Sequence, residues 1–163
     1  MNEFTHINEE GLATMVDISG KKISQRKAVA RSIVVLPDEV AEKLIDNDIK
    51  TKKGSVFQTA IIAGIMAAKK TGELIPLCHS LGLDNCEMEI QIHKQELVIE
   101  CTATITAKTG VEMEALMGAT IAALTVYDMC KALSHDIVIK EIKLMEKTGG
   151  KNDFKGLLMR VFY

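Results

Sequence analysis

Alternating hydrophobic and polar positions predict β-strands in both halves of the chain. The alternation is strongest over Glu87–Lys94 and Glu96–Thr106, and the Lys94-Gln95 connection between them predicts an antiparallel hairpin. Lys27–Leu36 alternates and then becomes continuously apolar, which is typical of a strand that enters a core. Further strands are predicted at Ile137–Met145, where the apolar spacing also suggests a bulge, and at Phe154–Phe162.

Apolar residues three and four positions apart predict helices. The clearest helix is expected from about Glu114 to Leu133, where the residues are so uniformly small or apolar that most of its surface should be buried. A second helix is predicted over Val56–Lys70, with Ser55 as its N-cap and enough alanine and glycine for another backbone to approach closely. A third is expected from Pro37 to about Asn47.

In chain order the elements are strand, helix, helix, strand, strand, helix, strand, strand. This order predicts an α+β fold, specifically a ferredoxin-like antiparallel sheet with the helices packed on one face. A chain of 163 residues can build one core but hardly two, so residues 1–163 are expected to form a single domain. Residues 1–26 show weak periodicity and are expected to form an extended N-terminal arm, and Leu74–Gly82 is expected to be a loop.

Composition and charge narrow the class of protein. A net charge of −2 gives no reason to expect nucleic acid or an anionic membrane as a partner. No apolar run approaches the roughly 20 residues of a membrane span, and the polar, acidic N-terminus is unlike a signal peptide. The four cysteines are scattered and are expected to be reduced, so we predict a cytoplasmic protein.

Charged residues at both ends of the predicted 114–133 helix are the first candidates for chemistry. Asp128 and Lys131 lie three positions apart, as an acid–base pair would, although an ion pair at a solvated helix end explains them equally well. Glu112 and Glu114 lie two positions apart and point to one side if the chain is extended there. Two carboxylates on one side need a cation, a hydrogen-bond donor or water beside them.

Two loops are further candidates. In the apolar segment after Pro76, Cys78 and His79 would suit a ligand contact, but a histidine held by backbone groups is the more common case. The loop from Lys147 to Lys151, KTGGK, could hold an anion, but a solvated turn is the simpler interpretation and the P-loop pattern is absent. No set of three ligands has metal spacing, so no metal site is expected.

Several short segments, taken together, resemble one family. The sequences LCHSL, TGVEMEAL, YDMCKA and KTGGK, and THI followed by MVDIS, resemble the cyclic pyranopterin monophosphate synthase family of molybdenum cofactor biosynthesis. The resemblance extends from Thr5 to about Phe154. It implies a ferredoxin-like fold, a hexamer built from dimers and a reaction without a cofactor. That reaction converts 3′,8-cyclo-7,8-dihydro-GTP to cyclic pyranopterin monophosphate and releases pyrophosphate.

By matched position, the resemblance implies that Asp128 and Lys131 are the catalytic pair. It implies substrate binding by Lys53, Lys69, Leu77, Cys78, His79, Glu112, Met113, Glu114 and Lys147. The chain departs from the family pattern at Ser80, where the family usually has proline, and at Ser55, where it usually has aspartate. We expect a looser loop at Ser80 and an equally good helix cap at Ser55.

The resemblance and the residues together lead to two mechanistic expectations and leave two alternatives. Neighbouring lysines should make Lys131 easier to deprotonate than a free lysine. Glu114 and Asp128 would lie about 20 Å apart along one helix, so a site shared between two chains is expected. The lysines and the glycine loop would also suit a non-catalytic nucleotide- or anion-binding oligomer, which does not need the Asp128 and Lys131 pair. A thiol or metal protein using Cys78 and His79 lacks the ligand spacing.

Overall fold

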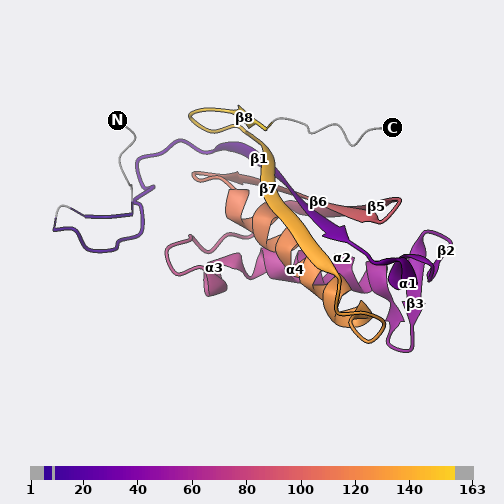
Figure 1. Ribbon diagram of the computed structural model, residues 1–163. Helices are drawn as coiled ribbons and strands as arrows, with labels where there is room; N and C mark the ends of the chain where they lie inside the picture. Colours follow the sequence, from indigo (N-terminus) through magenta and orange to yellow (C-terminus); the bar gives the residue numbers. More distant parts are fainter. Residues whose placement is uncertain (1–5, 9, 157–163) are drawn as a thin grey trace.

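The computed structural model describes residues 6–8 and 10–156 of the chain (Figure 1). Its main feature is a five-stranded sheet in the order β5-β6-β1-β7-β8, with every neighbouring pair antiparallel. The strands are β1 (Ser24–Val35), β5 (Asn85–His93), β6 (Glu96–Ala107), β7 (Val138–Thr148) and β8 (Phe154–Lys155). Together with the helices α2 and α4 described in the next paragraphs, this antiparallel sheet confirms the α+β class.

The predicted hairpin and the predicted bulge are both present. β5 and β6 pair from Asn85 opposite Thr104 to His93 opposite Glu96, and Lys94 has a φ of 58° in the connecting turn. The register of β7 against β1 shifts twice, once between Val29 and Ala30 and once further along, so β7 contains the extra residues that the apolar spacing suggested.

Two long helices, α2 (Val56–Lys69) and α4 (Glu112–Cys130), pack against one face of the sheet (Figure 1). Ser55 caps α2 as predicted, because its Oγ accepts a hydrogen bond from the Gln58 amide at 3.1 Å. The two helices approach closely where each has a glycine: a Cβ added to Gly64 would lie 2.8 Å from the carbonyl oxygen of Gly118. The small residues of these helices therefore allow close packing within one chain.

The segment between β1 and α2 contradicts the prediction of a helix from Pro37 to about Asn47. Asp46 and Asn47 have φ values of 52° and 58°, so they form a left-handed turn between two short strands. The apolar spacing suggested a helix, but the tolerance of aspartate and asparagine for positive φ favours this hairpin. The elements here are α1 (Asp38–Ala41), β2 (Leu44–Ile45), β3 (Asp48–Thr51) and β4 (Gly54–Ser55).

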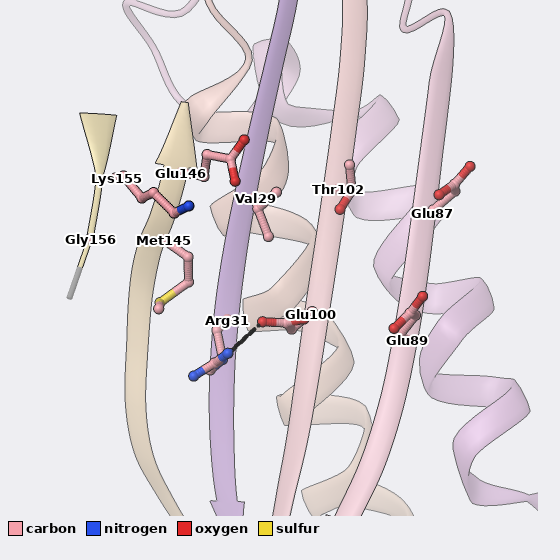
Figure 2. A pocket seen from close by; sticks show the side chains of 10 residues that line it. All are labelled: Val29, Arg31, Glu87, Glu89, Glu100, Thr102, Met145, Glu146, Lys155 and Gly156. Atoms are coloured by element: carbon pink, nitrogen blue, oxygen red, sulfur yellow. Dashed lines mark hydrogen bonds and ion pairs between the residues drawn. The ribbon is translucent and has the colours of Figure 1, made fainter. Parts of the chain in front are cut away.

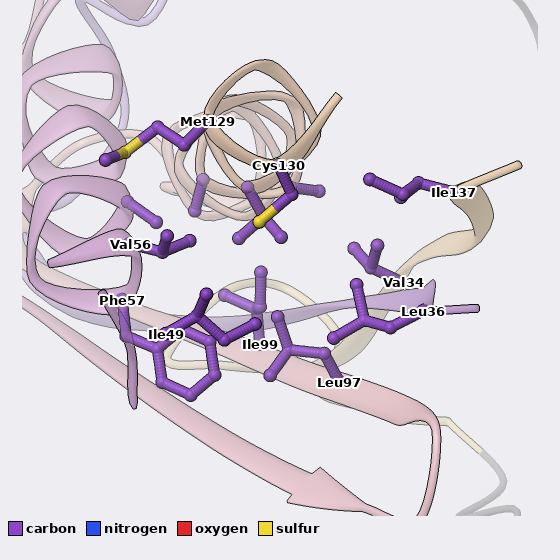
Figure 3. Packing of buried hydrophobic residues seen from close by; sticks show 14 of the residues in the cluster. Val34, Leu36, Ile49, Val56, Phe57, Leu97, Ile99, Met129, Cys130 and Ile137 are labelled. Atoms are coloured by element: carbon purple, nitrogen blue, oxygen red, sulfur yellow. The ribbon is translucent and has the colours of Figure 1, made fainter. Parts of the chain in front are cut away.

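The core between the sheet and the helices consists mainly of aliphatic side chains, with Phe57, Met129 and Cys130 among them (Figure 3). Leu97, Ile99 and Val126 are fully buried in it. Among the described residues, α4 alone is long and apolar enough, by length and composition, to cross a membrane, contrary to our expectation that no such segment exists. Its apolar surface packs against β1, β6, β7 and α2, so its place in the core accounts for its composition.

Several element ends differ from the predicted bounds. α4 begins at Glu112 rather than Glu114 and ends at Cys130 rather than Leu133. A single turn that was not predicted, α3 (Thr71–Leu74), precedes the loop around His79. Of the strand predicted over Phe154–Phe162, the structure contains β8, and residues 157–162 lie outside the described part of the chain.

The described residues before β1 form an arm that extends from the sheet (Figure 1). An isolated β-bridge joins Ile7 to Ala13 within this arm. Lys108, which follows β6, holds the arm to the rest of the protein: its Nζ donates a hydrogen bond to the Ser19 carbonyl oxygen at 2.7 Å.

Candidate active site

A cavity of about 370 Å³ lies at the N-terminal end of α4. The loop after α3 and the first turn of α4 contribute the predicted residues Leu77, Cys78, His79, Glu112, Met113 and Glu114. The arm closes another side with Val16 and Ile18. The structure thus brings together, in one cavity, two predicted segments that are more than thirty residues apart in the chain.

His79 is held by the backbone of the arm. Its Nε2 lies 2.9 Å from the carbonyl oxygen of Val16 and is therefore the protonated ring nitrogen, which leaves Nδ1 as an acceptor. His79 is therefore held by a backbone group, as we considered more common for such a histidine. The same ring also lines the cavity, so it is placed to contact a ligand as well. The loop itself packs on Gly72, where an added Cβ would lie 2.8 Å from the Ser80 Cα atom.

Glu114 is the most deeply buried acid of the cavity, with only 3% of its surface exposed. Burial raises the pKa of its carboxyl group, the neighbouring Glu112 adds to the rise, and its own backbone amide opposes it. Burial also raises the pKa of the Cys78 thiol, and the charge of Glu114 contributes. The cavity therefore disfavours the ionised form of both groups, and Cys78 is a thiol rather than a thiolate.

A second cavity, of about 700 Å³, joins the first one through the residues they share, Lys21, Thr109, Gly110 and Glu112. Its lining is strongly basic. Lys147, which was predicted to bind substrate, belongs to this lining, and its Nζ lies 3.1 Å from Glu112 Oε1. The other cationic side chains of the lining are Lys21, Lys22, Arg26, Lys27, Lys108 and Lys151. Such a lining suits a ligand with several negative charges.

Sequence reasoning missed most of these cations, Arg26 above all. Its Nε atom is buried and, in the described part of the chain, has no hydrogen-bond partner. The signal was present, because the basic pair Lys21-Lys22 stands just before β1 and the pair Arg26-Lys27 stands near its start. These pairs were overlooked because the sequence before Lys27 has no periodicity. The KTGGK loop closes over β1, and a Cβ added to Gly149, whose φ is 82°, would collide with the Gln25 carbonyl oxygen.

Asp128 and Lys131 lie at the other end of α4. Lys131 Nζ donates a hydrogen bond to Asp128 Oδ1 at 2.6 Å, and Lys53 Nζ lies 3.6 Å from Asp128 Oδ2. All three side chains are about half exposed or more. In one chain, Asp128 and Lys131 therefore form a solvated i, i+3 ion pair, which was one of the two interpretations of the sequence. Lys53 is a second lysine beside this pair.

The protonation of this pair differs from our expectation. The hydrogen bond and the charge of Asp128 raise the pKa of Lys131, so the prediction of an easily deprotonated amine is wrong for the isolated chain. Lys131 and, more weakly, Lys53 lower the pKa of Asp128. A lone chain holds Asp128 as a carboxylate and Lys131 as an ammonium group.

The structure thus places the predicted site residues in two groups at opposite ends of α4. Lys69, at the end of α2, lines neither cavity. Among the described residues, no group of three or more His, Cys, Asp or Glu side chains is arranged to hold a metal ion.

Fold and cavities together define an α+β protein with a basic cavity next to a carboxylate-lined one. The MoaC family matches residues 15–150, so the chain belongs to that family. The chain is 53% identical over 150 residues to the cyclic pyranopterin monophosphate synthase of Xanthomonas oryzae pv. oryzae, covering 91% of each protein.

Longer proteins also contain a similar region. The chain is 52% identical to the molybdenum cofactor biosynthesis bifunctional protein of Synechocystis sp. and to the molybdenum cofactor biosynthesis protein 1 of Dictyostelium discoideum. The matches cover 92% and 93% of this chain but only 45% and 27% of those proteins. The chain therefore spans less than half the length of these two relatives.

Proposed function

We propose that this chain is a cyclic pyranopterin monophosphate synthase, a lyase of molybdenum cofactor biosynthesis. It converts 3′,8-cyclo-7,8-dihydro-GTP to cyclic pyranopterin monophosphate and releases pyrophosphate. The names of relatives that match almost their whole length support this function. The observation that carries it is the basic cavity that shares four lining residues with the carboxylate-lined one, because the substrate joins a triphosphate to a purine-derived ring.

The basic cavity would hold the triphosphate. Lys147 and the other lysines of its lining are point charges for phosphate oxygens, and the Arg26 guanidinium group, which also lines the cavity, can donate to a phosphate in a planar, bidentate geometry. The ring system would then lie in the smaller cavity. There Glu114 can donate or accept a hydrogen bond at the ring edge, and Leu77 and Met113 supply apolar contact.

The reaction itself requires proton transfers. A cyclic phosphate forms when a substrate hydroxyl attacks the first phosphorus atom, and the bond to the pyrophosphate group breaks. The hydroxyl must lose a proton, and opening a ring of the substrate requires another transfer. Asp128 and Lys131 are our candidates for this acid–base pair, with Lys53 beside them to offset negative charge. None of these residues lines the two cavities of the same chain.

We therefore propose that each site is shared between two chains. A second copy would bring the C-terminal end of its α4 to the N-terminal end of α4 in the first. Exposed apolar side chains on the outer sides of the helices, such as Ile62 and Met66 of α2 and Leu124 of α4, support a contact there. The full assembly we propose is a hexamer built as a trimer of dimers.

The fold proposed for this enzyme is ferredoxin-like, with residues 1–163 as one domain. The strand order β5-β6-β1-β7, the antiparallel pairing and the helix connections β1–α2–β5 and β6–α4–β7 support it. The arm is shorter than the predicted residues 1–26, because Ser24, Gln25 and Arg26 belong to β1. The four free cysteines are typical of a reducing compartment, and we propose a cytoplasmic location.

The competing function is a nucleotide- or anion-binding oligomer without catalysis. It would use the same basic cavity but not the Asp128–Lys131 pair. Pyrophosphate release from 3′,8-cyclo-7,8-dihydro-GTP separates the two. If the chain is an enzyme, it releases many moles of pyrophosphate per mole of protein. If it only binds, the substrate is recovered unchanged.

A further inference from the structure

Cys86 of β5 and Cys101 of β6 lie next to each other on the face of the sheet that the helices cover. Glu87 of β5, and Glu100 and Thr102 of β6, line the open face that points away from α2 and α4 (Figure 2). Because successive side chains of a strand point to opposite faces, the cysteines that neighbour these residues in sequence point toward the helices. There Cys86 Sγ and Cys101 Sγ are 3.8 Å apart, and both thiols are free.

The two thiols differ in exposure. Cys101 is fully buried, and a Cβ added to Gly118 of α4 would lie 2.5 Å from its Sγ, so the backbone of α4 covers this sulfur. Cys86 is partly exposed and belongs to β5, at one edge of the five-stranded sheet. A small oxidant in solution therefore reaches Cys86, while α4 shields Cys101 from it.

Cys86 is also the thiol that ionises most readily. The hydrogen bond from Cys101 lowers the pKa of the Cys86 thiol, against the opposing effects of burial and of the Glu87 charge. Burial raises the pKa of Cys78, which is partly exposed too, and raises that of Cys130 to about 11. Because the thiolate is the reactive form of cysteine, exposure and ionisation both favour attack by Cys86.

The positions of the two cysteines in the sheet determine how stable a bond between them is. Cys86 is opposite Ala103 and Cys101 is opposite Met88, so the cysteines are diagonal neighbours. The Cα atoms of diagonal neighbours are about 7–8 Å apart, whereas a disulfide usually spans about 4.4–6.8 Å. To bring the sulfur atoms to the bonding distance of about 2.05 Å, the edge strand β5 must shift toward β6. A disulfide formed under such strain is easily reduced again.

We propose that Cys86 and Cys101 form a site of reversible oxidation by hydroperoxides. The Cys86 thiolate attacks one peroxide oxygen, the O–O bond breaks, and Cys86 becomes a sulfenic acid while the other oxygen takes up a proton and leaves as water or an alcohol. The Cys101 sulfur then attacks the sulfenic sulfur, the S–O bond breaks, and the Cys101 proton leaves with the hydroxide as water. In total, two electrons pass from the two thiols to the peroxide, and a disulfide forms.

The function of the pair would be to keep the oxidation of Cys86 reversible. Capture of the sulfenic acid by Cys101 competes with further oxidation to sulfinic acid, which is irreversible in ordinary cysteines. A monothiol or dithiol can reduce the strained disulfide. The inference does not rest on the proposed reaction, because neither cysteine lines the two cavities of the candidate site.

Peptide mapping after treatment with hydrogen peroxide tests the proposal. Wild type, Cys86→Ala, Cys101→Ala and Cys78→Ala are treated, their remaining thiols are alkylated in denaturant, and tryptic peptides are weighed. Cys78→Ala is the matched control, because Cys78 is also partly exposed and lies on the same tryptic peptide as Cys86, between Lys70 and Lys94. Far-UV circular dichroism checks that each variant is folded.

We expect wild type and Cys78→Ala to give one pair of linked peptides, joined through Cys86 and Cys101 of a single chain. The pair should be about 2 Da lighter than the two reduced peptides together, and dithiothreitol should separate them. Cys86→Ala should give no link. In Cys101→Ala no thiol captures the sulfenic acid, so Cys86 should instead gain about 32 or 48 Da, as sulfinic or sulfonic acid. If Cys101→Ala does not fold, the maps of wild type and Cys78→Ala still decide the question.

The proposal is overturned if peroxide leaves Cys86 and Cys101 of folded wild type free for alkylation. It is also overturned if the linked peptides contain other cysteines or come from two chains, as a doubled mass on a non-reducing gel would show. A wild type in which Cys86 becomes sulfinic acid as completely as in Cys101→Ala would show that Cys101 does not capture the sulfenic acid, and would overturn it as well.

Discussion

Glu114 and Asp128 stand in the first and last turns of one unbroken helix, α4. Fourteen residues of helix separate them by about 20 Å along the axis. The buried carboxyl and the exposed ion pair therefore cannot act on one reacting atom from the same chain. If both belong to one site, the site must be completed by a second copy, and the predictions below test each part of that account.

Lys131→Ala should abolish most of the chemistry and leave the fold intact. Lys131 is the exposed C-cap of α4, so alanine costs little helix stability. Loss of a general acid or base should lower kcat about 100-fold or more. The control is Lys70→Ala, which removes an exposed lysine from the C-cap of α2 and should change kcat little. Steady-state release of pyrophosphate provides the measurement, and a Lys131→Ala rate within a few-fold of wild type would refute the assignment.

Glu114→Gln should change how stability depends on pH. Burial raises the pKa of Glu114 above its ordinary value of 4.5, so between that value and the raised one the folded state binds more protons than the unfolded state. The free energy of unfolding must then decrease as pH rises through this range.

Glutamine cannot ionise, so the stability of the variant relative to wild type should increase as pH rises above 4.5 and through the raised pKa of Glu114. Urea unfolding across this range measures the difference, with exposed Glu73→Gln as the control. Curves for Glu114→Gln and wild type that stay parallel would show that burial does not penalise the ionised carboxyl.

Gly72→Ala should disturb the loop that holds His79. The added methyl group would lie 2.8 Å from the Ser80 Cα atom, and a backbone atom cannot move aside without shifting the loop. A displacement of this kind should lower kcat/KM about tenfold or more. Gly82→Ala is a matched control, because a Cβ there meets nothing within 4 Å. Equal kcat/KM for the two variants would mean that the loop position does not matter for turnover.

Arg26→Gln should weaken the binding of phosphate groups. The charge-assisted hydrogen bond that it can offer to phosphate corresponds to about 1.5–3 kcal/mol, or roughly a 10- to 100-fold rise in the inhibition constant for pyrophosphate. Lys43→Gln removes an exposed cation far from the cavity and should leave that constant unchanged. If both substitutions act equally, the effect is one of net charge and not of the Arg26 site.

The sequence predicted the regular parts of the fold well. The β5–β6 hairpin, the Ser55 cap and the core position of α4 follow from local patterns that packing reinforces. It failed at the Asp46-Asn47 turn, where apolar spacing suggested a helix and the left-handed tolerance of two short polar side chains prevailed.

The candidate site was predicted in part. Motifs identified the residues around His79 and Glu114, which the structure places in one cavity. They did not reveal Arg26, because a cation near the start of β1, in a part of the sequence without periodicity, becomes significant only when the glycine loop folds beside it. Nor did the motifs indicate the raised pKa of Lys131, which depends on the 2.6 Å contact with Asp128.

Complementation between two inactive variants tests the shared site most directly. Glu114→Ala and Asp128→Ala are purified separately with different tags, mixed under conditions that exchange subunits, and assayed for pyrophosphate release. In a shared site, one chain supplies Glu114 and the other supplies Asp128. Random exchange then gives about one quarter of the sites both wild-type residues, and we expect roughly that fraction of wild-type activity to return. A mixture that stays inactive, although both tags are recovered in one oligomer, would show that the two residues do not serve one site from different chains.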